Sequence, residues 1–132
     1  MTTTTYQVDQ VTTNKMKDYR AHLRTITNGL EEMAKAAGLT ITVKGSASHG
    51  SRPDKGVDAI LAAAHVLTAL QNIVSRQVMP LKPVVVTIGT IHGGTAENVI
   101  CDHVTMEGTL RTTTPQDRSF ALQHIEKVAR GI

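Results

Sequence analysis

The chain switches several times between two spacings of its apolar residues, and this switching limits what it can fold into. Residues 39–44, LTITVK, alternate strictly between apolar and polar, which is the pattern of a strand with one buried face. Residues 14–37 and 57–76 instead place apolar residues at steps of three and four, which predicts amphipathic helices. Strands and helices must therefore bury their apolar faces against each other.

Two further strands and a last helix are expected downstream. Residues 84–91, VVVTIGTI, are mostly β-branched and predict a strand, and residues 104–111 predict another. The glycine pair in residues 93–95, GGT, predicts a turn after the first of these strands. Thr114 is expected to cap a final helix that has Pro115 at its first position.

The first 38 residues give a weaker pattern. Residues 6–11 partly alternate and predict a short strand. Asn14 is expected to cap the helix over residues 14–37, and Gly38 to end it in the left-handed conformation.

The order of elements from residue 39 onward is strand, helix, strand, strand, helix, which is a ferredoxin-like split βαβ layout without its last strand. We expect an α+β two-layer sandwich in which helices cover one face of an antiparallel sheet. With 40% hydrophobic residues, the 132 residues are predicted to form one domain, 1–132, with 39–132 as its core. The strand and helix within residues 1–38 are either an addition that fills the missing place or the mark of a permuted domain.

The composition argues against several classes of partner. The net charge is only +3 and aromatic residues make up 2%, so a nucleic-acid site is not expected. No apolar run approaches the roughly 20 residues of a membrane span, and the N-terminus shows no secretory signal. The single cysteine, Cys101, excludes an internal disulfide and suits a reducing cytoplasm. We therefore expect a cytoplasmic protein.

Four segments, in order, resemble the small dimerisation ("lid") domain of zinc-dependent amidohydrolases and metallopeptidases of the aminoacylase, carboxypeptidase G and hippurate hydrolase kind. They are residues 45–60, GSASHGSRPDKGVDAI; residues 70–76, LQNIVSR; residues 93–100, GGTAENVI; and residues 108–112, GTLRT. Each motif is short, but four in the right order are specific. The resemblance covers residues 39–132, while residues 1–38 match less clearly.

The resemblance implies substrate-contact roles for three residues. His49 would donate a hydrogen bond to the carbonyl oxygen on which negative charge develops. Asn98 and Arg111 would hold the terminal carboxylate of the substrate, since a guanidinium offers two parallel donors. Without the resemblance, His49 would be taken as a surface residue, Arg111 as a solvated cation and Asn98 as a turn former.

The metal centre that hydrolysis in this family needs is not evident in the sequence. The chain shows no His-x-Asp followed by an acidic cluster, so no metal ligand and no catalytic residue is assigned beyond His49 as an inherited candidate. Glu31 and Glu32 are adjacent but fall in the middle of a predicted helix, and Cys101 has no evident His and acid partners. Zinc or another divalent metal is expected in a catalytic domain that this sequence lacks.

Three hypotheses about function follow from the resemblance. The first is a self-associating lid domain, a homodimer or higher oligomer, that contributes substrate contacts and is not catalytic alone. In the second, the chain is a fragment of an active metal-dependent hydrolase of N-acyl amino acids or peptides. The third is a rearranged or engineered scaffold that reuses the lid fold for assembly. The partners expected are a second copy and the catalytic domain.

Overall fold

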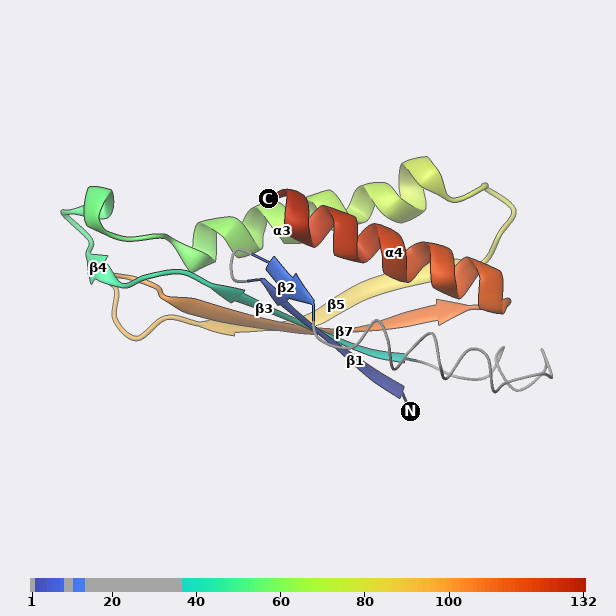
Figure 1. The fold of residues 1–132 in the computed structure, drawn as a ribbon, viewed down its shortest axis with the longest axis horizontal. Helices are drawn as coiled ribbons and strands as arrows, with labels where there is room; N and C mark the ends of the chain where they lie inside the picture. Colours follow the sequence, from blue (N-terminus) through green and yellow to red (C-terminus); the bar gives the residue numbers. More distant parts are fainter. Residues whose placement is uncertain (1, 9–10, 14–36) are drawn as a thin grey trace.

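The computed structural model describes residues 2–8, 11–13 and 37–132, and these form a five-stranded sheet with two helices on one face (Figure 1). The strand order is β2-β1-β3-β7-β5. The three strands expected from the sequence are β3 (Ala37–Lys44), β5 (Val84–Gly93) and β7 (His103–Thr112), with β7 between the other two and antiparallel to both. The predicted α+β sandwich with an antiparallel core is therefore confirmed.

The N-terminal residues add two strands beyond β3. β1 (Thr2–Val8) pairs with β3, and β2 (Val11–Thr13) pairs antiparallel with β1. The predicted single strand over residues 6–11 is thus wrong, because Val8 and Val11 face each other across a pair of strands. β1 takes the place of the last strand of the split βαβ layout but runs parallel to β3. Parallel neighbours need a connection of a dozen or more residues, and residues 9–36 provide that length.

Most of the predicted helix over residues 14–37 lies outside the described residues, including its cap Asn14. Its predicted end is wrong, because Ala37 and Gly38 already belong to β3, where they pair with Leu110 and Thr109 of β7. Gly38 therefore continues a strand. The left-handed glycine of the described chain is Gly94, with φ of 90°, in the turn that the sequence predicts after β5.

The second helix is shorter than predicted and ends in an unusual way. α3 (Ala59–Asn72) is capped by the Asp58 carboxylate, which accepts hydrogen bonds from the N–H groups of Ile60 and Leu61. It continues into one π-helical turn, η2 (Ile73–Gln77), closed by the Val78 N–H donating to the Ile73 carbonyl at 3.0 Å. Together they reproduce the predicted span of residues 57–76 except for its first two residues.

The core lies between the sheet and the helices and is entirely aliphatic apart from a methionine and a cysteine. Residues of β3 and β7 at alternate positions meet residues of α3 and α4 (Pro115–Gly131) at steps of three and four. The buried residues of this core are Leu39, Ile41, Val43, Ala59, Ala63, Val66, Leu70, Ile73, Val84, Cys101, Val104, Met106, Leu110, Ala121, Leu122, Ile125 and Ala129. Small residues such as Ala59 and Ala63 let α3 approach the sheet closely.

Residues 59–77 are also long and apolar enough to cross a membrane, judged by length and composition alone. This differs from the sequence expectation, because the segment interrupts its apolar residues with polar ones and with the charged Arg76. The same segment supplies five buried residues to the core, which is what a helix packed on a sheet does. A membrane span is therefore only weakly indicated.

The start of α4 is fixed by a network of side chains. The Thr114 hydroxyl accepts a hydrogen bond from the Asp117 N–H at 3.1 Å and donates to the Asp117 carboxylate at 2.6 Å. Lys82 from the connection before β5 reaches the same carboxylate at 2.7 Å. The Lys82 ammonium, and next the Thr114 hydroxyl, hold the pKa of Asp117 below its usual value. The predicted cap is thus confirmed, and it also ties α4 to β5.

Replacing Asp117 with Asn tests this network. A lowered pKa in the folded state means that the charged carboxylate stabilises the fold above about pH 4, and that this stabilisation is lost as the pH falls through the lower folded-state pKa. We expect the variant to lose about 1 kcal/mol of unfolding free energy at neutral pH. Its stability should then fall less than that of the wild type between about pH 5 and pH 2, as measured by urea unfolding. The exposed Asp102→Asn is the control, and parallel pH curves for the wild type and Asp117→Asn would contradict the prediction.

Candidate functional site

His49 lies in a small two-stranded ribbon beyond the end of the main sheet. β4 (Ser48–His49) pairs antiparallel with β6 (Val99–Ile100), so that His49 faces Val99. The next residue, Gly50, donates its N–H to the Asn98 carbonyl at 2.7 Å. Two segments about fifty residues apart in the sequence are thereby brought together. The structure places His49 and Asn98 side by side along the backbone, and both residues are exposed.

A tight turn holds the His49 ring. The Arg52 N–H donates to the His49 carbonyl at 2.8 Å and closes the turn over residues 49–52. Inside it, Ser51 contacts the His49 Nδ1 atom twice, through its N–H at 3.1 Å and its hydroxyl at 2.8 Å. Arg52 and Asp54 form a two-bond ion pair on the surface of the same loop, with both distances 2.8 Å. An Arg52 hydrogen bond to Asp54 keeps the pKa of that carboxyl below its usual value.

Arg111 lies at the opposite end of the domain. It is next to the last residue of β7, where it pairs with Val85 of β5, whereas His103 begins β7 beside the ribbon. At about 3.4 Å per residue, roughly 27 Å of strand separates His103 from Arg111. Arg111 is exposed between the buried Leu110 and Thr112, so it lies on the face of the sheet away from the helices. One copy of the chain therefore brings together His49 and Asn98 but not Arg111.

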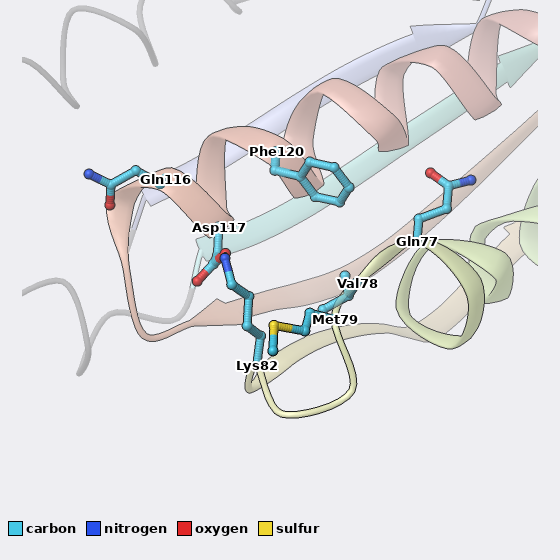
Figure 2. A pocket seen from close by; sticks show the side chains of 7 residues that line it. All are labelled: Gln77, Val78, Met79, Lys82, Gln116, Asp117 and Phe120. Carbon is cyan, nitrogen blue, oxygen red and sulfur yellow. The ribbon is translucent and has the colours of Figure 1, made fainter.

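A hollow of about 360 Å³ lies at the Arg111 end of the domain, but on the helix side (Figure 2). It lies between the connection before β5 and the first turns of α4. Its lining residues are Gln77, Val78, Met79, Lys82, Gln116, Asp117 and Phe120. The two charged groups neutralise each other in the Lys82–Asp117 ion pair. None of the three predicted site residues lines this hollow.

No metal site is found in the part of the chain that the structure describes, since no three His, Cys, Asp or Glu side chains lie close enough to share an ion. Cys101 is buried, and its thiol donates to the His103 carbonyl at 3.0 Å. The described residues thus do not fit the metal that hydrolysis in the resembled family uses. Ser51, which contacts the His49 ring, was not among the site residues predicted from the sequence.

Comparison with known proteins agrees with the fold. Residues 33–131 match the family described as a peptidase dimerisation domain. The chain belongs to this family. An uncharacterised hydrolase of Sinorhizobium fredii is 49% identical over 92 residues, which are 70% of this chain and 23% of that protein. The N-acetyldiaminopimelate deacetylase of Bacillus pumilus is 39% identical over 99 residues, 75% of this chain and 26% of that enzyme.

Solved structures give the same result. A protein described as an aminohydrolase from methicillin-resistant Staphylococcus aureus superposes with a TM-score of 0.69 at 38% identity, over 73% of this chain and 25% of its own. The chain spans about a quarter of the length of the curated relatives it matches. The relatives named here are described as hydrolases, and this chain matches the dimerisation-domain family.

Gly56→Ala tests how the loop before α3 holds the His49 ribbon. A β-carbon at residue 56 would lie 2.5 Å from the Ser48 hydroxyl oxygen and 2.8 Å from the Ser46 carbonyl oxygen, so one of them must move. We expect a loss of about 1–3 kcal/mol in the free energy of unfolding, measured with urea, and a shift of the His49 ring resonances in NMR spectra. Gly131→Ala is the matched control, because nothing lies within 4 Å of its new β-carbon. Unchanged stability and unchanged His49 signals in Gly56→Ala would show that the packing is looser than the structure indicates.

Proposed function

We propose that this chain is the self-associating lid domain of a metal-dependent amidohydrolase or peptidase, and that two copies join through the free edge of β5 and the adjoining side of α3. The observation that carries the proposal is that the outer edge of β5 is unpaired among the described strands and lacks charged residues and proline. The ten residues of β5, VVVTIGTIHG, include no proline, lysine, arginine, aspartate or glutamate. Monomeric proteins usually protect such an edge with charges or proline.

An exposed apolar cluster lies beside this edge. Ile60 of α3 is 50% exposed, and its Cδ1 atom would lie 3.7 Å from a β-carbon placed on Gly94, just after β5. Ile91 of β5 is also 50% exposed and, because it pairs with the buried Met106, lies on the helix side of the sheet. Leu61 is 57% exposed on the same turn of α3 as Ile60. The cluster therefore continues from the strand edge onto the helix, and a second copy would bury both.

A two-fold axis would also bring the three site residues to the same end of a joined sheet. When two copies of β5 pair antiparallel, the Val84 end of one strand lies beside the Gly93 end of the other. Arg111 pairs next to the Val84 end, and Asn98 with His49 lies beyond the Gly93 end. Arg111 of one copy then lies at the same end of the joined sheet as His49 and Asn98 of its partner. We infer that a substrate contact made by all three residues requires the dimer.

The chemistry of the three side chains fits a substrate with a terminal carboxylate and an amide carbonyl. The guanidinium of Arg111 can donate two parallel hydrogen bonds to a carboxylate. The Asn98 amide adds a donor, and the imidazole of His49 can donate to a carbonyl oxygen that becomes negative during water attack. We propose that zinc or another divalent metal, held in a separate catalytic domain, supplies the activated water. The described residues provide no step of that kind.

A second candidate function is favoured because the chain spans only about a quarter of each of these relatives. Because it matches about a quarter of several hydrolases, the chain can also be the dimerisation part of an active hydrolase of N-acyl amino acids or peptides, with the catalytic domain as its second partner. The N-acetyl substrate in the name of the Bacillus pumilus relative is consistent with that class. The single cysteine supports a reducing cytoplasm as the proposed location.

The Ile60→Asp variant tests self-association. We expect the wild-type chain to be a dimer or a higher oligomer by light scattering at high micromolar concentration. A buried aspartate without a partner costs several kcal/mol, so Ile60→Asp should weaken association at least about a hundredfold. Ile132→Asp is the matched control, because Ile132 is similarly exposed at the end of α4 and lies outside the proposed interface. A monomeric wild type, or equal dissociation of the two variants, would disprove the proposed interface.

The absence of catalysis by this chain alone is tested by adding zinc or cobalt and N-acyl amino acids. We expect no hydrolysis above that of the metal in buffer, because the described residues provide no metal cluster. Release of the free amino acid is the measurement. Turnover that rises in proportion to the protein concentration would show that the chain has a catalytic centre of its own.

A further inference from the structure

The His49 ring is held by hydrogen bonds to one of its two nitrogens, Nδ1. We propose that Ser51 is a positioning residue that fixes the neutral His49 imidazole in the form with its proton on Nε2. The N–H and the hydroxyl of Ser51 both converge on Nδ1, at 3.1 and 2.8 Å. The functional value of this arrangement rests on the proposed role of His49 as a donor to substrate.

The backbone contact determines the direction of the hydrogen bond. A peptide N–H can only donate, so Nδ1 must accept when it is bonded to the Ser51 N–H. In a neutral imidazole one nitrogen accepts and the other carries the proton, which places the proton on Nε2. The hydrogen bond from the Arg52 N–H to the His49 carbonyl at 2.8 Å closes the turn and holds the Ser51 N–H in this position.

The hydroxyl of Ser51 strengthens the same arrangement. At 2.8 Å from Nδ1 it can donate a second hydrogen bond to the ring. A proton on Nδ1 would instead leave the Ser51 N–H facing another hydrogen, and only the hydroxyl could then accept. The backbone N–H of Ser51 therefore selects the tautomer, and the hydroxyl adds a second hydrogen bond to the same nitrogen.

This arrangement leaves Nε2–H as the donor that His49 presents. A donor whose direction is set before the substrate arrives stabilises a developing negative charge without further reorganisation. His49 is exposed, so the turn, and not burial in the core, has to provide this order. Ser51 would thus act on the substrate only through His49.

The experiment measures the tautomer directly in the complete chain labelled with nitrogen-15. Two-bond proton–nitrogen correlation spectra at alkaline pH distinguish protonated from unprotonated ring nitrogens, and the spectrum of His49→Gln identifies the His49 signals among those of six histidines. In the wild type we expect Nδ1 to resonate as an acceptor and Nε2 as a protonated nitrogen. Ser51→Ala keeps the backbone N–H, so Nε2 should stay protonated, while the Nδ1 resonance should shift away from that of Nε2 because Nδ1 loses the hydrogen bond from the hydroxyl. Ser51→Thr should restore the wild-type positions.

Ser46→Ala is the matched control, since Ser46 is an exposed serine of the same loop whose backbone, and not its side chain, is paired with Val57. It should leave the His49 signals in place. A wild type with its proton on Nδ1, or a Ser51→Ala spectrum equal to that of the wild type, would overturn the proposal. The spectra do not depend on association or on substrate. Failure of the proposed dimer would therefore leave this result standing, and the reverse also holds.

Discussion

The pairing of β3 with β7 at the centre of the sheet determines where every candidate site residue lies. One end of this ladder, Lys44 opposite His103, leads directly into the ribbon that carries His49. The other end, Ala37 opposite Leu110, is followed at once by Arg111. A single run of backbone hydrogen bonds thus separates the histidine from the arginine by the length of a strand. No side-chain movement within one copy can close such a distance.

Much of the fold could be predicted because its elements are long enough to show a period. The strands around residues 84–91 and 104–111, and the helix capped by Thr114, were expected within about two residues of their observed bounds. β4 and β6 could not be predicted in this way, because a strand of two residues has no period. The position of β1 in the sheet could not be predicted either. Alternation shows that a segment is a strand but not which neighbour it pairs with.

The candidate site was predictable as a set of residues but not as an arrangement. The motifs identified His49, Asn98 and Arg111, and the structure brings the first two together. The separation of Arg111 follows from its place on β7, which the motif alone does not give. Ser51 was missed because its contribution is a pair of hydrogen bonds to a neighbouring ring, and such bonds depend on turn geometry that residue types do not specify.

The two edges of the sheet differ greatly in length, and this difference bears on how large an assembly can grow. β5 offers ten residues to a partner, whereas the opposite edge is β2, which has three. If two copies join through β5, each outer border of the combined sheet is stepped in the part of the chain that the structure describes, because β2 covers only Tyr6–Val8 of β1 and leaves Thr2–Thr5 beyond it. A stepped border gives another chain no long straight row of backbone groups to pair with. The association would then be self-limiting and would end at a closed pair, without the open-ended growth that leads to fibres.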